Sequence, residues 1–520
     1  EMSASLVGSE MCIRDRLISL IGMLAALIAD KMRPGMILFS VLVIFLCAGI
    51  LSPKEMLEGF SNKGMITVAM LFLVSEGIRQ SGALTKLIKK LLPVDNTNVI
   101  KSQVRMLPSI AFISAFLNNT PVVVIFAPII KRWANYVKLP ATYFLIPLSY
   151  VTILGGMCTL IGTSTNLVVH SMIQEAGMQG FSMFELGKVG IFIALAGILY
   201  LFAFSTRLLP SERKELIPSE DDSSLHTVEA IIGPRFPGIN KRISDFDFKR
   251  HYGAEIKELK RGGNTYTNLS KLRFRENDTL VIMADDSFIK TWGESSVFIM
   301  LANGKEQEPA GKKKRWLALT LLVMMIIGAT VGELPAVQEA LPEGIKLDMF
   351  FFVSITTVIM AWTKIFPPRK YTKYISWDVL ITIACAFGIS KAMANSGVSD
   401  LIASHIIGLS KSYGPYVLLA VMFIITNIFT ELITNNAAAA LSFPIALSIS
   451  NQLGVSPMPF FVIICMAASA SFSTPIGYQT NLIVQGIGNY KFTDFVRIGL
   501  PLNIITFLIS VLLIPQIWPF

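Results

Sequence analysis

Long apolar stretches separated by short polar connections make up most of this 520-residue chain. A helix needs roughly 20 consecutive apolar residues to cross a bilayer, and most of the stretches approach that length or exceed it. The pattern therefore predicts an all-α polytopic membrane protein. The predicted apolar segments are 17–29, 35–51, 64–85, 108–130, 140–170, 186–209, 316–333, 349–366, 376–395, 415–449, 458–485 and 495–519.

Residues 210–315 interrupt this pattern with a polar, charged stretch that is long enough for a small inserted α+β domain. Short runs with turn residues between them predict strands at 228–232, 254–260 and 279–284, with short helices at about 243–250 and 286–292. Residues 1–16 are polar and are set aside as an atypical N-terminal segment. The predicted division is thus 1–16, a first membrane repeat at 17–209, the domain with its linkers at 210–315, and a second membrane repeat at 316–520.

Basic residues indicate the sides of the membrane, because short cytoplasmic connections are enriched in Lys and Arg. Connections 86–105 and 131–138 are both strongly basic, so segment 108–130 between them is expected to have both ends in the cytoplasm. A segment that enters and leaves on one side does not cross. We therefore predict a re-entrant hairpin that is broken near residues 118–121.

The other connections follow the same rule. Connections 30–34 and 367–377 are basic and are expected in the cytoplasm, together with the central domain. Connections 171–187 and 334–346 carry acids and almost no bases, so they are expected outside. Segment 415–449 has weakly charged flanks and a polar interruption, which predicts a second hairpin that enters from outside.

An internal repeat relates the two membrane parts. The motif IGTSTNL at 161–167 shares five of its seven residues with IGYQTNL at 476–482, which follows 315 positions later. Further matches at offsets of 315 or 316 pair Ser81-Gly82 with Ser396-Gly397, Asn119 with Asn435, and Pro128 with Pro444. We predict inverted repeats, each with a re-entrant hairpin and a broken helix, that form a binding site where they meet at mid-membrane.

The two hairpin tips and the two glycine-containing breaks are predicted to form that site, because non-helical backbone persists at membrane depth only where it lines a cavity. Asn and Thr at the tips cap the following helices, whose free N–H groups and partial positive charge attract an anion. Unwound carbonyls and Asn oxygens suit Na⁺, which is expected near Asn119, Gly162, Asn435 and Gly477. The candidate residues for substrate and ion binding are Asn118, Asn119, Thr120, Gly162, Thr163, Asn166, Thr434, Asn435, Asn436, Thr474, Gly477, Thr480 and Asn481.

A purely structural role is the alternative for these polar residues, since Asn, Thr and Ser often join helices inside membranes. The recurrence of polar interruptions in both halves favours the binding site. Two acids in apolar surroundings, Glu76 and Glu431, are candidates for a functional role and equally for a paired structural one.

Composition supports the membrane interpretation and excludes other classes. The chain is 53% hydrophobic and 15% charged, whereas soluble domains carry about 25% charged residues. Its net charge of +10 follows from basic connections, so no nucleic-acid partner is expected. Scattered Cys and His, with no nucleophile elbow or phosphate loop, indicate neither an enzyme nor an organic cofactor.

Four motifs resemble the divalent anion–sodium symporter family of the ion transporter superfamily, which includes citrate, sulfate and arsenite permeases. They are LNNTP (117–121), GGMCTLIGT (155–163), TNNAAAAL (434–441) and TPIGYQTN (474–481). The resemblance covers residues 17–209 and 316–519. It implies a secondary carrier for sulfate or a di- or tricarboxylate, with Na⁺ as the coupling ion, that acts as a homodimer by an elevator movement.

The family's Ser-Asn-Thr hairpin motif falls on Asn118-Asn119-Thr120 and on Thr434-Asn435-Asn436. By the resemblance, these residues contact the substrate and frame the sodium sites. The central Asn is kept in both halves, but the leading Ser is replaced in both, and the trailing Thr becomes Asn in the second. These differences leave open the choice between sulfate and carboxylates, and the choice of coupling ion.

The inserted domain resembles a TrkA-C domain, the C-terminal half of regulators of potassium conductance, over residues 222–298. The segments that carry this likeness are 228–239, 251–263 and 272–285. The resemblance implies a domain that dimerises or senses a small regulatory ligand, and a passive spacer is the alternative.

Two other functions stay open. One is an arsenite or antimonite efflux permease of the same superfamily, although no Cys lies in a tip or a break motif. The other is a potassium-transport component regulated through the TrkA-C-like domain; residues 475–478 faintly resemble a selectivity filter, but the matching residues 161–163 do not repeat it. In each case we expect a multi-pass protein of a bacterial-type plasma (inner) membrane, in contact with lipid, with residues 210–315 in the cytoplasm.

Overall fold

The computed structural model describes most of the chain. The described residues are 19, 21–23, 25–27, 32–92, 98–211, 226–233, 236–262, 264–270, 272–284, 288, 297–302, 311–339, 342, 346–410 and 414–520. The atypical segment 1–16 and much of the predicted segment 17–29 lie outside them.

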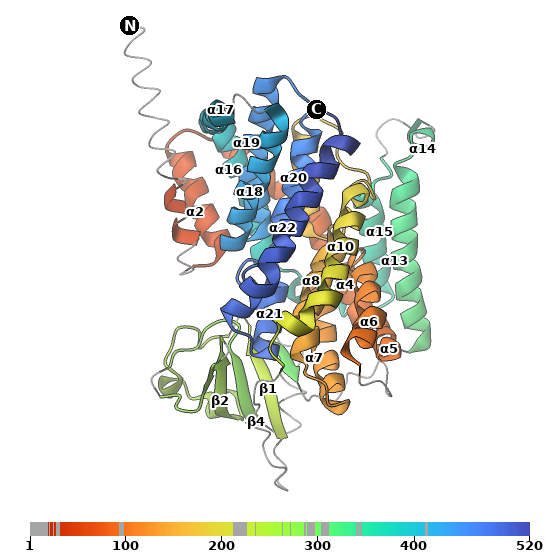
Figure 1. Ribbon diagram of the computed structural model, residues 1–520, viewed down its shortest axis with the longest axis vertical. Coiled ribbons are helices and arrows are strands. Elements are labelled where there is room, and N and C mark those ends of the chain that lie inside the picture. Colours follow the sequence, from red (N-terminus) through yellow and green to blue (C-terminus); the bar gives the residue numbers. More distant parts are fainter. Residues whose placement is uncertain are drawn as a thin grey trace.

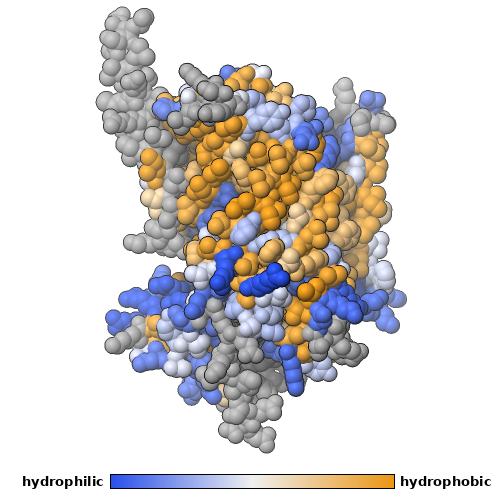
Figure 2. Space-filling model, in the orientation of Figure 1, coloured by the Kyte–Doolittle hydropathy of each residue, from blue (hydrophilic) through white to orange (hydrophobic). Residues whose placement is uncertain are grey.

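Helices dominate this part of the chain and pack side by side into a bundle (Figure 1). Among the described residues, six helices are long and apolar enough to cross a membrane: Pro53–Gln80, Gly187–Leu208, Lys312–Gly332, Trp377–Asn395, Gly414–Leu432 and Phe492–Ile517. On the face that Figure 2 shows, apolar side chains form a broad band over the bundle. On Phe492–Ile517, for example, Leu500, Ile504 and Leu508 are each 50% exposed. Such a surface belongs in lipid, so the chain is an integral membrane protein.

The helices before the sheet are α2 Pro34–Cys47, α3 Pro53–Glu58, η1 Gly59–Ser61, α4 Lys63–Gln80, α5 Ala83–Leu91, α6 Val99–Ser114, α7 Asn119–Tyr136, α8 Thr142–Gly156, α9 Ser164–Glu175 and α10 Gly187–Leu208. Those after it are α13 Lys312–Gly332, α14 Pro335–Glu339, α15 Met349–Trp362, η3 Pro368–Lys373, α16 Trp377–Asn395, α17 Val398–Ser410, α18 Gly414–Leu432, α19 Asn435–Leu453, α20 Met458–Ser469, α21 Gln479–Gly488 and α22 Phe492–Ile517.

Several helices of the two groups correspond at a nearly constant offset along the chain. The repeated sequence motif has an offset of 315 residues. The same offset leads from both ends of α2 to both ends of α15, and from both ends of α3 to both ends of η3. It also relates the first residue of α9 to the first residue of α21. Applied to the first residue of α7, the same offset leads to Thr434, and α19 begins one residue later, at Asn435. The spacing found in the short sequence motifs therefore extends to whole elements.

Both predicted hairpins are pairs of helices with a short non-helical tip, α6–α7 and α18–α19. The first hairpin runs from Val99 to Tyr136 and is longer than the predicted segment 108–130. It includes Lys101 and Arg105 on α6 and Lys131 and Arg132 on α7. These basic residues were expected in connections, and that expectation was wrong. Lys101, Arg105 and Arg132 are exposed, so their charges remain near water.

Two further helices were not predicted. Helices α5 and α17 occupy stretches that the sequence indicated as connections. In α5, Leu84 and Ile88 are buried while Lys90 is exposed, so apolar and basic residues take opposite faces. Such a short amphipathic helix has too many charges to be recognised as a span and too few apolar residues in a row.

A five-stranded antiparallel sheet is formed by the described part of residues 226–302, which we call the sheet unit. Its strands are β1 His226–Ile232, β2 Glu255–Arg261, β3 Asn264–Tyr266, β4 Thr279–Ala284 and β5 Phe298–Ala302, in the order β3-β2-β4-β1-β5. Strands β1, β2 and β4 lie where strands were predicted, whereas β3 and β5 were not. The predicted helix 243–250 is split into η2 Ile243–Asp245 and α11 Phe248–Tyr252, and most of 286–292 lies outside the described residues. The unit has its own apolar core, centred on aromatic residues such as Phe236 and Phe274.

The sheet unit lies against one end of the bundle, next to α7 and α21 (Figure 1). The Lys131 ammonium of α7 is 3.0 Å from a Glu229 carboxylate oxygen of β1 and donates to the carbonyl of Ile487 in α21 at 3.0 Å. Lys260 of β2 holds the other oxygen of Glu229 at 2.8 Å. Burial tends to raise the pKa of Glu229, but the two ammonium groups outweigh it and lower the pKa to about 2. One carboxylate thus joins the sheet unit to the first hairpin.

Candidate functional site

The tip of the first hairpin is organised by two asparagines. Asn118 caps α7 and accepts a hydrogen bond from the backbone N–H of Thr120 at 3.4 Å. Asn119, which is 1% exposed, accepts one from the Ser114 hydroxyl at 2.7 Å. The first N–H groups of α7 therefore end at a polar tip inside the bundle, as the sequence predicts.

The tip of the second hairpin repeats this arrangement and keeps one buried polar group unpaired. The Thr430 hydroxyl lies 2.8 Å from Asn435 Oδ1, as the Ser114 hydroxyl lies beside Asn119 Oδ1, and it also lies 2.6 Å from the Ala468 carbonyl oxygen. The buried Thr434 hydroxyl has no partner among the described residues. Unpaired polar groups are costly in a membrane interior, so their presence indicates a place for a ligand.

The break between α8 and α9 is held by Asn166. Its Nδ2 donates to the carbonyls of Thr159 at 2.9 Å and Gly156 at 3.4 Å. The N–H of Gly162 donates to the Thr159 hydroxyl at 3.1 Å. A Cβ on Gly162 would come within 2.5 Å of the Gly156 carbonyl oxygen, so the turn is closed too tightly for any side chain.

The break between α20 and α21 repeats these hydrogen bonds in the second half of the chain. Asn481 Nδ2 donates to the carbonyls of Ser471 at 2.8 Å and Thr474 at 3.1 Å, and the Gly477 N–H donates to the Thr474 hydroxyl at 3.3 Å. The Ser149 hydroxyl of α8 contacts Thr480 Oγ1 at 2.9 Å and Asn481 Oδ1 at 2.7 Å. In the first break, by contrast, the buried Oδ1 of Asn166 has no partner among the described residues.

The structure brings the tips and breaks of the two halves together. Asn119 Nδ2 donates to the Tyr478 hydroxyl at 2.6 Å, which lies 3.3 Å from the Thr163 hydroxyl. The Thr120 hydroxyl donates to Gln479 Oε1 at 3.4 Å. On the other side, Asn436 Oδ1 accepts from Ser164 at 3.1 Å and from Thr165 at 3.3 Å. Each tip is thus bonded to the break of the other half, at the starts of four helices, and these residues form one polar cluster.

Several residues of this cluster were not predicted, namely Tyr478, Gln479, Ser164, Thr165, Ser149 and Thr159. Tyr478 and Gln479 lie inside the repeated motif, at the two positions where its copies differ. This difference could have identified Tyr478 and Gln479 from the sequence. A motif that keeps its turn but changes its side chains indicates that the two halves use these positions differently.

The electrostatics of the cluster come from dipoles, since the tips and breaks (115–120, 157–165, 433–436 and 470–480) contain no ionisable residue other than Cys158 and Tyr478. Helices α7, α9, α19 and α21 all begin here, and each start carries partial positive charge and free N–H groups. Four converging helix starts with neutral hydroxyl and amide groups suit an anion whose charge is spread over several oxygens.

The two acids singled out by the sequence lie beside the cluster in different roles. The Glu431 carboxylate accepts from the backbone N–H groups of Ser473 and Thr474 and from Asn503 Nδ2, each at 2.8 Å. It therefore fixes the second break against α22. The Glu76 carboxylate lies 2.6 Å from the Arg79 guanidinium, one helical turn away. This ion pair corresponds to the structural alternative given for Glu76.

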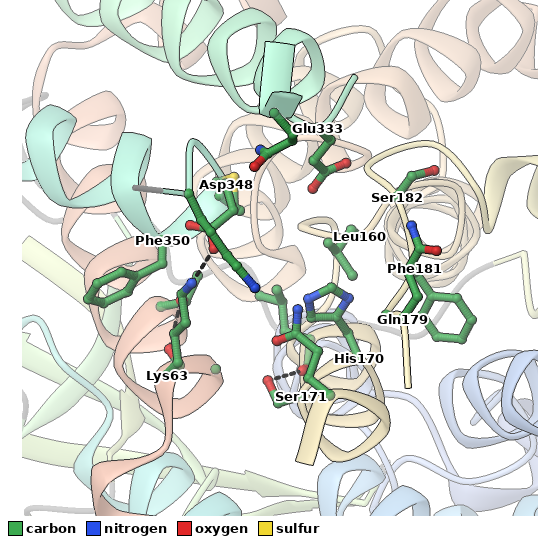
Figure 3. Close-up of a pocket in the computed structure, with 18 residues that line it drawn as sticks. Lys63, Leu160, His170, Ser171, Gln179, Phe181, Ser182, Glu333, Asp348 and Phe350 are labelled. Carbon is green, nitrogen blue, oxygen red and sulfur yellow. Dashed lines mark hydrogen bonds and ion pairs between the residues drawn. The ribbon is translucent and has the colours of Figure 1, made fainter. Parts of the chain in front are cut away.

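A cavity of about 270 Å³ borders the first break, where Leu160 contributes to its wall (Figure 3). Figure 3 shows Lys63 paired with Asp348 on one side of the cavity and His170 and Ser171 of α9 on the other. The wall also includes Glu333 and Lys346, so both signs of charge are present. The cavity adjoins the polar cluster without containing a tip residue.

Comparisons with known proteins identify the family of the chain and several relatives. A model of a family described as citrate transporter matches residues 24–441 and 343–520. The chain is 28% identical to an uncharacterized transporter of Synechocystis, over 92% of each chain. It is 30% identical to probable sodium/sulfate cotransporter 3 of Chlamydomonas reinhardtii, over 54% of this chain and 31% of that protein. It is 27% identical to human solute carrier family 13 member 4, over 29% and 23% respectively.

Proposed function

The chain belongs to the citrate transporter family, and from that premise we propose that it is a secondary active transporter that carries sulfate or a di- or tricarboxylate together with Na⁺. The observation that supports this most is the neutral polar cluster between the two hairpin tips and the two breaks. Relatives named as sodium/sulfate cotransporters support the same substrate class.

The anion is proposed to bind where the four helix starts converge. The Thr434 hydroxyl, which has no partner among the described residues, is a ready donor on one side. Backbone N–H groups at the helix starts add partial positive charge without any fixed cation. Because the protein supplies no full positive charge in the tips and breaks, a cation that enters with the anion would balance it.

Sodium is proposed to bind beside the breaks. Asn166 Oδ1 is buried and unpaired among the described residues, and the carbonyls of the first break lie next to the same side chain. Amide and carbonyl oxygens are the ligands that a hard monovalent cation prefers in unwound membrane helices. Asn119 and Asn435 are equivalent residues of the two tips, so we propose that both contribute to ion and anion binding.

Alternating access is proposed to follow from inverted repeats. The recurrence of whole elements at a nearly constant offset, with matching hydrogen bonds at both tips and both breaks, supports two copies of one unit. The charge pattern of the connections supports their opposite orientation. By resemblance, the unit that holds the tips and breaks moves as an elevator within a homodimer, and the sheet unit faces the cytoplasm.

Uptake of radiolabelled sulfate into proteoliposomes tests this function, with and without an inward sodium gradient. We expect saturable uptake that requires sodium, and competition by unlabelled succinate and citrate then ranks the substrates. Arsenite is included as a competitor. Sodium-independent uptake would overturn the proposed coupling, and the absence of sulfate or carboxylate transport under either gradient would overturn the proposed substrate class.

A further inference from the structure

Tyr478 breaks the symmetry of the polar cluster at its centre. It precedes α21 with φ −132° and ψ 131°, and Thr163 precedes α9 with φ −134° and ψ 144°. The two backbones are therefore alike, and the two residues stand 315 positions apart. Only the side chains differ. Thr163 is short, whereas the phenol of Tyr478 is long enough to contact Asn119 and Thr163 in the first half of the chain.

The Tyr478 hydroxyl ends between the first tip and the first break. It accepts the hydrogen bond of Asn119 Nδ2 at 2.6 Å, so its own hydrogen is free to point elsewhere. The Thr163 hydroxyl oxygen lies 3.3 Å away, which is a long contact for two hydroxyls. An anion oxygen placed there would accept a shorter and stronger bond.

The two tips consequently offer different groups to a ligand. Beside the second tip, the Thr434 hydroxyl has no partner among the described residues, whereas the Nδ2 of Asn119 at the first tip is already bound to the phenol. On the side of the first tip, the group that reaches a ligand is therefore the Tyr478 hydroxyl. The aromatic ring also takes up space that a second threonine would leave open.

We propose that Tyr478 determines the specificity of the anion site: its hydroxyl donates to the bound anion, and its ring restricts the site to a compact tetrahedral oxyanion of the sulfate class. This inference rests on the proposed transport function and narrows its substrate. A dicarboxylate carries two separated charges and needs donors that stand further apart. With the ring in place, the donors of both sides converge on one small anion.

Two variants test this inference in proteoliposomes that are loaded with the full chain. Tyr478→Phe keeps the ring and removes the hydroxyl, and we expect a roughly tenfold rise in KM for sulfate, as for the loss of one hydrogen bond to a charged ligand. Tyr478→Thr copies the first break, and we expect the ratio of sulfate to succinate transport efficiency to fall at least about tenfold. Tyr200→Phe is the matched control, because it removes a buried hydroxyl that bonds the Ile498 carbonyl at 3.0 Å between α10 and α22.

The outcomes separate this inference from the function on which it rests. Failure of the wild-type chain to transport sulfate would overturn both the proposed substrate and the role of Tyr478. Sulfate transport by the wild type, with KM and selectivity unchanged in both folded variants, would overturn the role of Tyr478 alone. If Tyr478→Phe does not fold, as judged by thermal unfolding in detergent, the selectivity of Tyr478→Thr decides.

Discussion

Lys131 on the first hairpin and Glu229 on the sheet unit form an ion pair at 3.0 Å, across 98 residues of sequence. Lys131 lies on the helix that starts at the first tip, and Glu229 lies on β1, an interior strand of the sheet. The sheet unit is thus attached to an element of the candidate site, and a change in the sheet unit has a direct path to α7.

We predict that Glu229→Gln loosens the sheet unit from the bundle. The pKa of Glu229 is lowered to about 2 from an ordinary value of 4.5, so its stabilising contribution is present above about pH 4.5 and is lost as the pH falls toward 2. At pH 7 the variant loses the full contribution, about 1–3 kcal/mol. Limited proteolysis of the sheet unit at pH 7 measures this loosening.

The control for that experiment is Glu255→Gln, because Glu255 is an exposed acid on strand β2 of the same sheet. We expect its cleavage rate to equal that of the wild type. Equal cleavage of Glu229→Gln and the wild type would show that the ion pair does not hold the sheet unit.

The orientation of the two hairpins gives a second prediction. Single cysteines are placed at Asn98 and Lys138, at the ends of the first hairpin, and at Gly454, at the end of the second, in a background without native cysteines. Inverted repeats predict that Asn98 and Lys138 react with an impermeant maleimide only from the cytoplasmic side, and Gly454 only from the other side. Labelling of Lys138 and Gly454 from the same side would contradict the inverted arrangement.

The two breaks give a third prediction. Gly477→Ala would place a Cβ within 2.0 Å of the Ser471 hydroxyl oxygen and 2.4 Å of the Thr430 carbonyl oxygen, so the second break cannot keep its shape. We expect a destabilisation of about 1–3 kcal/mol, as for overpacking, with a large loss of transport. Gly408→Ala in α17 is the matched control, since nothing lies within 4 Å of the position that its Cβ would take and helix propensity favours Ala. Thermal unfolding in detergent compares the two, and equal stability would show that the second break tolerates a side chain.

Much of the helical architecture is predictable from the sequence, because membrane spans depend on local apolar length. The hairpins, the breaks and the polar tips follow from charge placement and from Asn, Thr and Gly at repeated spacings. Helices α5 and α17 do not, since both are short and α5 is interleaved with lysines. Strands β3 and β5 are likewise short; β3 pairs with the preceding strand β2, whereas β5 pairs with the distant strand β1.

The site is predictable in its residues but not in its contacts. The motifs identify Asn119 and Asn435, but nothing in them indicates that Asn119 bonds Tyr478, which lies 359 residues away. The same holds for Glu431, whose carboxylate holds the second break only because α18, α20 and α22 meet there. Contacts of this kind depend on packing between elements, and local sequence patterns carry no record of it.

The central claim is that the two tip asparagines hold anion and cation together, and sulfate uptake by Asn119→Ala and Asn435→Ala tests it most directly. Each variant is reconstituted beside the wild type, with thermal unfolding and size-exclusion profiles to verify folding. Loss of sodium-driven uptake by about a hundredfold or more in both variants, with folding retained, is the result that the account predicts. Full uptake in both folded variants would contradict it.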